Sequence, residues 1–296
     1  KGGAGKPTIT YNGSMTVGQV KNTADMMNAY EFVQLQRELL DDADFESNYI
    51  TDLYGSLEDY RYAPTYDWQD YIYRTALSHN HHVSMTGSQG DLKYSTSLSY
   101  TDQQGIIIRS GLKRYQGRVN LSQKVNKRLK VDFTGNYASN VQDGPTASTA
   151  TTAMSTAYMY SVWAFRPVSP TGSDMLNQMY DEGVNMTEDY RFNPVHSARN
   201  EYRHKTTNNV SADYEFIKGL KLKIAAGYTS RDYTNEEFNS SMTRTGNSHP
   251  SNTQSKGINA YLYKSEARSY LNENTLTYQF NKNKHNFNAL AGLSFQ

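Results

Sequence analysis

The segment with the clearest capacity to bind a ligand is a group of aromatic and basic residues near the middle of the chain. Its members are Tyr158, Tyr160, Trp163, Phe165 and Arg166. Sugar rings stack on aromatic faces through their apolar C–H sides, and an arginine can donate paired hydrogen bonds to hydroxyl or carboxylate groups. The same residue types dominate ordinary protein interfaces, so packing within the loop or against a partner protein is the alternative interpretation.

A second group of residues is acidic. Asp41, Asp42 and Asp44 stand close together, with Glu46 beside them. Calcium prefers clustered carboxylate oxygens, so a calcium site is a hypothesis for this segment, and no other cofactor is expected. The spacing does not match an EF-hand loop, and a solvated acidic loop explains the same residues.

Two histidines are candidate metal ligands, whereas the common catalytic motifs are absent from the sequence. His79 and His81 share one face of an expected strand and could hold a metal ion. No third ligand is visible, so the favoured interpretation is a pair of polar side chains that face a barrel lumen. The sequence contains no cysteine, no G-x-S-x-G motif and no H-E-x-x-H motif. The chain is therefore not expected to be an enzyme.

Strands are expected to position His79 and His81, because residues 79–137 alternate in polarity with a period of two. Successive side chains of a strand point to opposite sides, so one face meets an apolar medium and the other meets water. Segments of about 10 residues with this pattern suit tilted strands that cross a hydrocarbon layer. The pattern predicts that Val131, Phe133 and Tyr137 face lipid and that Lys130, Asp132 and Asn136 face the lumen.

Composition agrees with a barrel in a membrane. The chain has 296 residues, a net charge of +1 and 25 tyrosines, with a mean hydropathy of −0.79. Few aliphatic residues and many tyrosines suit a polar lumen and a thin outer band edged with aromatic side chains, and Trp68 is interpreted as a structural anchor near the outer membrane interface. No apolar run reaches the roughly 18 residues of a membrane helix. The balanced charge gives no reason to expect a nucleic-acid partner.

The expected fold class is all-β, a partial transmembrane antiparallel β-barrel of about nine strands with one loop helix near residues 23–40. The expected strands cover residues 8–17, 79–87, 92–102, 114–122, 128–137, 206–216, 220–233, part of 260–280, and 287–295. The helix would be capped by Thr23 or Asp25. Joins after the even strands are short and joins after the odd strands are longer, as with short periplasmic turns and long extracellular loops. An open sheet edge is costly in lipid, so further strands are expected beyond Gln296.

Several ordered phrases carry a resemblance to a known family. They are GKPTITYNGSMTVGQ, MMNAYEFVQLQREL, DWQDYIYRTALSHNHHVSMTGSQGDLKYSTSLSYTDQQGII, LKRYQGRVNLSQKVNKRLKV and HNFNALAGLSFQ. In these phrases the sequence resembles SusC/RagA-type TonB-dependent transporters of the Bacteroidetes outer membrane. The resemblance covers nearly the whole chain.

The resemblance implies a larger assembly than this chain. It implies a barrel of about 22 strands with a plugged lumen, a segment that contacts TonB ahead of the plug, and a SusD-like lipoprotein over the extracellular mouth. Substrates would be oligosaccharides or oligopeptides, and two transporter–lipoprotein complexes could pair as a dimer. Residues 1–7 would be the exit from the missing plug, and residues 8–296 the N-terminal part of the barrel. The alternatives are an adhesin or structural barrel without a transport role, and an outer-membrane barrel hydrolase.

Overall fold

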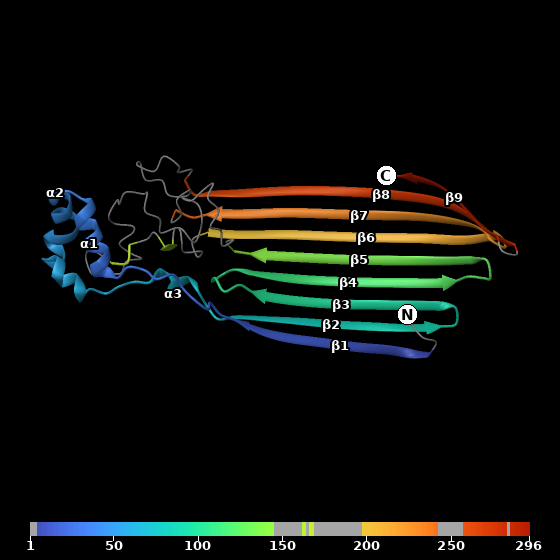
Figure 1. Cartoon of the computed structure of the whole chain (residues 1–296), viewed down its shortest axis with the longest axis horizontal. Coiled ribbons are helices and arrows are strands. Elements are labelled where there is room, and N and C mark those ends of the chain that lie inside the picture. Colours follow the sequence, from blue (N-terminus) through green and yellow to red (C-terminus); the bar gives the residue numbers. More distant parts are fainter. Residues whose placement is uncertain (1–4, 145–161, 164–165, 169–196, 242–256, 283–284) are drawn as a thin grey trace.

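The computed structural model describes residues 5–144, 162–163, 166–168, 197–241, 257–282 and 285–296. Within these residues the chain forms one antiparallel sheet whose nine strands follow one another in chain order, as Figure 1 shows. The strands are β1 Gly5–Gly18, β2 Ala76–Gln89, β3 Leu92–Gln104, β4 Gly111–Lys124, β5 Leu129–Asp143, β6 Ser197–Ile217, β7 Leu220–Asn239, β8 Asn259–Lys282 and β9 His285–Phe295. The predicted fold class, a partial antiparallel barrel, is confirmed.

The connections are sorted by length, as the sequence predicts. Only Gly90 and Asp91 separate β2 from β3, and only Lys218 and Gly219 separate β6 from β7. The long connections leave from the other end of the sheet (Figure 1). Both short turns use a glycine in the left-handed region, with φ 56° at Gly90 and φ 90° at Gly219, a conformation that other residues adopt only with strain.

The register confirms that the two faces of the sheet differ. Directly opposite residues of an antiparallel pair lie on the same face. Phe133 lies opposite Leu121 of β4 and Val210 of β6. Its neighbour Asp132 lies on the other face, opposite Ser122. The predicted sorting of Val131, Phe133 and Tyr137 from Lys130, Asp132 and Asn136 is therefore present in the sheet. We call the two sides the apolar face and the polar face.

The apolar face is uncovered. Ile9, Met15 and Leu98 keep 69%, 71% and 67% of their surface exposed. Exposed apolar surface of this extent marks contact with a membrane or another protein. None of the described helices is both long enough and apolar enough to span a membrane.

The apolar band crosses the sheet obliquely. The register row that contains Met15 in β1 passes through His79 and ends at Lys264 in β8. In β7 the band lies closer to the short turns, where Leu222 pairs with Leu276. Strands of outer-membrane barrels tilt by about 35–45°, so a band parallel to the membrane cuts the register rows at an angle. The oblique band is what such a tilt requires.

The first long connection folds into a helical module of residues 19–75, which lies beyond the end of the strands (Figure 1). Its helices are α1 Ala29–Leu39, α2 Asp42–Phe45, the π-helix η1 Glu46–Tyr54, the 3-10 helix η2 Leu57–Arg61, and α3 Trp68–Ile72. A core of its own stabilises the module, built from Ala29, Val33, Phe45 and Tyr60, with Val168 from the third long connection. One helix was predicted here, so the prediction missed most of the module.

The predicted start of the helix was wrong. α1 begins at Ala29, and its N-cap is Asn28 instead of Thr23 or Asp25. The Asn28 side chain accepts a hydrogen bond from the Glu31 backbone N–H, and the Glu31 carboxylate accepts one from the Asn28 backbone N–H, both at 2.9 Å. This reciprocal capping box satisfies two backbone donors, which fixes the helix start more strongly than a single polar residue would.

Candidate ligand-binding site

The predicted aromatic and basic group is only partly described. Tyr158, Tyr160 and Phe165 lie outside the described residues. Trp163 and Arg166 are described, and they lie in a short segment of the third long connection whose residues Val162 and Val168 are each 1% exposed. This segment is therefore packed against other parts of the protein.

Hydrogen bonds join the described residues of this segment to the helical module. The indole Nε1 of Trp68 donates to the backbone oxygen of Arg166 at 2.8 Å. The backbone N–H of Tyr66 donates to the backbone oxygen of Pro167 at 2.7 Å. The indole Nε1 of Trp163 donates to Gln69 Oε1 at 3.2 Å. Two connections far apart in sequence thus form one surface.

Gln69 is a positioning residue that the sequence did not reveal. Its side chain is 1% exposed, and its Nε2 donates to the Ala24 backbone oxygen at 2.8 Å. Its Oε1 accepts from the Ala24 backbone N–H at 2.9 Å and from Trp163. A buried amide with both ends hydrogen-bonded holds its neighbours in one arrangement. The available signal was its place beside Trp68, which was predicted to be a structural anchor near the outer membrane interface. Trp68 is 4% exposed, and its place relative to the membrane stays a prediction.

A groove of about 290 Å³ opens where the two connections meet. Its walls carry sulfur-containing and aromatic side chains, namely Met26, Met27, Phe32, Tyr66, Trp68 and Trp163. Trp163 and Met27 remain 38% and 47% exposed. Aromatic faces can stack on the apolar side of a sugar ring or pack against an apolar side chain, and methionines adapt to irregular shapes.

Two aspartates belong to the same groove. Asp25 lines it beside Met26. Asp67 also lines it and is the N-cap of α3, where it accepts a hydrogen bond from the Gln69 backbone N–H at 2.9 Å. Arg166 is not among the described lining residues. The structure therefore brings Trp163 to the groove, and Arg166 supplies the backbone oxygen that accepts from Trp68. Ligand binding by Arg166 stays a prediction.

Tyr60 and Glu58 of the helical module have shifted pKa values. Tyr60 donates to the Tyr49 backbone oxygen at 2.6 Å, and burial, followed by the neighbouring Tyr54 and Tyr49, raises the pKa of its hydroxyl. On the module surface, the hydrogen bond from Arg61 is the main cause that lowers the pKa of Glu58.

The acidic residues considered for calcium have other contacts. Asp41 is the N-cap of α2 and accepts from the Asp44 backbone N–H at 2.9 Å. Asp42 pairs with Arg37 at 2.7 Å. Within the part of the chain that the structure describes, no three His, Cys, Asp or Glu residues are grouped to hold a metal ion. Calcium binding stays a prediction.

The interpretation of His79 and His81 as lumen-facing was wrong. His81 lies opposite Gly13 and Tyr100, on the face that carries Val83 and Leu98. Its Nδ1 is 2.7 Å from the hydroxyl of Tyr11. The ring of His79 lies 5.6 Å from that of Tyr100. These rings lie on the apolar face near the long connections, where amphipathic aromatic side chains gather at a membrane interface.

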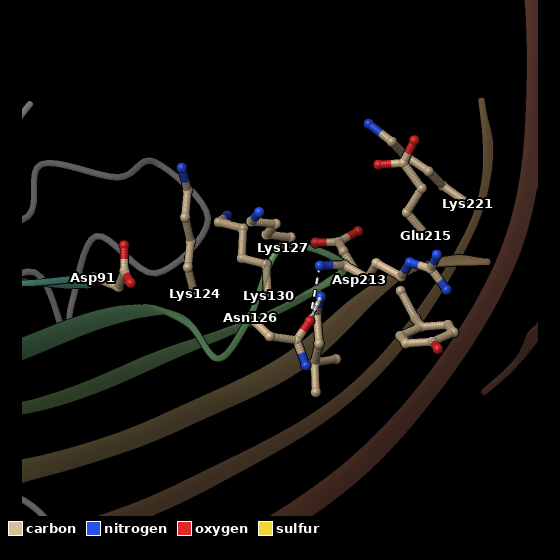
Figure 2. A pocket seen from close by; sticks show the side chains of 11 residues that line it. Asp91, Lys124, Asn126, Lys127, Lys130, Asp213, Glu215 and Lys221 are labelled. Carbon is tan, nitrogen blue, oxygen red and sulfur yellow. Dashed lines mark hydrogen bonds between the residues drawn. The ribbon is translucent and has the colours of Figure 1, made fainter. Parts of the chain in front are cut away.

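A larger hollow of about 790 Å³ lies at the short-turn end of the sheet (Figure 2). Basic side chains outnumber acidic ones in its lining, with Lys124, Lys127, Lys130 and Lys221 near Asp213 and Glu215 (Figure 2). The turn between β4 and β5 forms part of its lining. There Asn126 Oδ1 accepts from the backbone N–H groups of Arg128 and Leu129 at 2.8 and 2.9 Å.

The sheet, its uncovered apolar band and the sorting of its connections define a segment of an outer-membrane-type β-barrel. Solved structures have the same fold. The RagAB peptide importer in its open-open state superposes with a TM-score of 0.67 at 23% identity, over 99% of this chain and 34% of that one. A second structure, of the RagAB peptide transporter, gives 0.65 at 22% identity over 99% and 35%.

The curated relatives give the family resemblance. TonB-dependent receptor P3 of Formosa agariphila is 27% identical over 100% of this chain and 27% of its own length. TonB-dependent receptor SusC of Bacteroides thetaiotaomicron is 35% identical over 39% of this chain and 10% of its own length. No family model matches. The relatives confirm the resemblance to SusC/RagA-type TonB-dependent receptors, and the chain spans about a quarter of the first relative's length.

Proposed function

We propose that this chain forms part of the wall of a TonB-dependent importer in the outer membrane. The observation that carries the proposal is the alignment of the whole chain with a TonB-dependent receptor, together with a sheet whose apolar band is exposed and oblique. A soluble protein would have to cover that band, whereas a lipid bilayer requires it.

The proposed cargo is an oligosaccharide or a peptide, captured with a SusD-like surface lipoprotein. The relatives are named as receptors, and the structural neighbours as a peptide importer. None of the relatives and structures reported above is named as a hydrolase or an adhesin. The segment that contacts TonB would lie in a part of the protein ahead of residue 1, with residues 1–7 as the exit from a plug, and two transporter–lipoprotein complexes could pair.

The groove between the two connections is the proposed contact site at the extracellular face. Trp163 is fixed by its bond to Gln69 and still exposes 38% of its surface. A rigid, partly exposed indole loses little conformational freedom on binding, which suits it for stacking on a ligand or a lipoprotein side chain.

The test is uptake by cells that express the full-length protein, with and without TonB. We expect growth on glycan or peptide mixtures to require both proteins. We also expect a surface lipoprotein to co-purify after gentle detergent extraction. Trp163→Ala should impair ligand or lipoprotein binding, whereas Tyr62→Ala, at a residue 90% exposed, should not. Growth that is independent of TonB would overturn the proposal.

A further inference from the structure

The polar face carries a pair of like charges that the sheet itself does not explain. Lys205 of β6 lies directly opposite Arg231 of β7, and both side chains are exposed. Like charges directly opposite each other destabilise a sheet. Among the described residues, no carboxylate forms an ion pair with either side chain. The pair therefore lowers stability without an internal counter-charge in the described part of the chain.

Two arginines of β4 add to this charge. Arg114 and Arg118 lie on the same face, in the register rows on either side of Lys205, and both are exposed. We name Arg114, Arg118, Lys205 and Arg231 the basic cluster. Adjacent strands are about 4.8 Å apart, and β4 lies two strands from β6 and three from β7. The basic cluster therefore spans roughly 14 Å, which suits an oligomer with more than one anionic group.

Small side chains lie beside the central pair Lys205 and Arg231, and the carboxylate of Glu201 on the same face is already paired. Ala138 lies opposite Lys205, and Ala267 lies opposite Arg231, so methyl groups flank the pair within its own register row. The carboxylate of Glu201 on the same face is bonded to Arg203 at 2.6 Å. An anion could therefore lie over the alanines without displacing a bulky side chain or meeting an unpaired carboxylate.

The positive charge continues toward the short turns on the same face. Lys124 of β4 lies directly opposite Lys130 of β5, and Lys221 lines the same hollow (Figure 2). Lys130 is paired with Asp132 at 2.6 Å, whereas no ion pair with Lys124 or Lys221 is present in the described ranges. Asp213 lies opposite Lys130, and Glu215 lies opposite Lys221, so basic side chains exceed acidic ones here without being the sole charges. An excess of one sign of charge raises the local concentration of oppositely charged solutes.

We propose that the basic cluster is an anion-binding subsite on the inner wall of the barrel, and that the imported oligomer carries carboxylate or sulfate groups. This inference rests on the proposed importer and names its substrate class. The planar guanidinium groups of Arg114, Arg118 and Arg231 match carboxylate and sulfate oxygens with paired hydrogen bonds. The ligand would supply the counter-charge that the sheet lacks.

The experiment uses the purified full-length protein and two matched pairs of probes. The first pair is tetragalacturonate and its neutral methyl ester, and the second is tetraglutamate and tetraglutamine. Calorimetric titration at low and at high salt measures their affinities. We expect the intact protein to prefer the acidic member of at least one pair, and that preference to weaken at high salt. A preference in one pair alone assigns the anionic groups to sugars or to peptides.

The variant Lys205→Gln/Arg231→Gln should weaken binding of the acidic probe by about tenfold or more, as expected for the loss of charge-assisted contacts. Binding of the neutral probe should not change. The control Lys113→Gln/Lys264→Gln removes the same charge from exposed residues of the apolar face and should bind like the unmodified protein. The exchange Lys205→Arg/Arg231→Lys keeps both charges and should retain acidic-probe binding, which separates loss of charge from misfolding.

Equal affinity of the intact protein for acidic and neutral probes would overturn the proposal. So would unchanged acidic-probe binding in a folded Lys205→Gln/Arg231→Gln variant. TonB-dependent uptake of neutral oligomers without preference for acidic ones would refute this inference and leave the importer intact. Absence of any TonB-dependent uptake would instead refute the proposed function.

Discussion

The indole of Trp68 donates a hydrogen bond to the backbone oxygen of Arg166 at 2.8 Å, across 98 positions of the sequence. Trp68 is 4% exposed, so the donor side of this part-buried bond is shielded from water. It fixes the third long connection to α3 in the first, and it forms one side of the groove that presents Trp163. The geometry of the candidate site therefore depends on a contact between two connections.

Removal of this bond should loosen the groove. In Trp68→Phe the Arg166 oxygen loses a buried donor, which costs about 1–3 kcal/mol. We expect faster proteolysis of the connection between β5 and β6 and weaker binding of the ligand or lipoprotein. Tyr62→Phe changes an aromatic residue that is 90% exposed and serves as the control. Equal proteolysis rates in the two variants would contradict the role given to Trp68.

The turn between β6 and β7 should depend on Gly219 more than the turn between β2 and β3 depends on Gly90. Both glycines have positive φ, so alanine costs about 1–2 kcal/mol at either position. A Cβ at Gly219 would also collide with the backbone oxygen of Gln279, whereas a Cβ at Gly90 would meet nothing within 4 Å. Gly219→Ala should lower the yield of heat-modifiable folded barrel on gels, and Gly90→Ala should lower it much less. Similar losses in the two variants would show that the strain of a positive φ accounts for the effect and that the collision with the Gln279 oxygen adds nothing.

A charge on the apolar face should impair assembly. Phe133 lies opposite Leu121 and Val210. Phe133→Arg would place a charge in lipid at a cost of about 2–4 kcal/mol near the midplane. Thr134→Arg places the same charge on the polar face, opposite Asn120, and should assemble. Normal heat-modifiable mobility of Phe133→Arg would show that this face does not meet lipid.

Alkaline pH should weaken the helical module through Tyr60. Burial raises the pKa of this hydroxyl above the value of about 10 in an unfolded chain. A raised pKa gives stability that is present below pH 10 and is lost as the pH rises further, because only the unfolded chain then releases the proton. Tyr60→Phe removes this pH dependence and also the bond to the Tyr49 oxygen. The check is tryptophan fluorescence from pH 8 to 12, compared with Tyr62→Phe. An unchanged alkaline transition in Tyr60→Phe would contradict this assignment.

Sequence patterns predicted the strands because their signal is local. The alternation at residues 128–137 fixes which side chains share a face, and the register of Phe133 with Leu121 agrees. The strands extend further than predicted, as in β6 Ser197–Ile217. Beyond the membrane band both faces become polar, so alternation fades while backbone pairing continues. A strand ends where its backbone pairing with a neighbouring strand ends. The polarity of its own side chains does not indicate that point.

The sequence by itself determined a sheet with one apolar and one polar face, short turns at one end and long connections at the other, because period and turn residues are properties of neighbours in the chain. Tertiary structure alone decided that Gln69 and Trp163 meet, that His81 joins Tyr11 on the apolar face, and that Lys205 stands opposite Arg231. These relationships depend on register and on the packing of distant connections. Many partners are compatible with the polarity of each segment, and only the folded chain selects one.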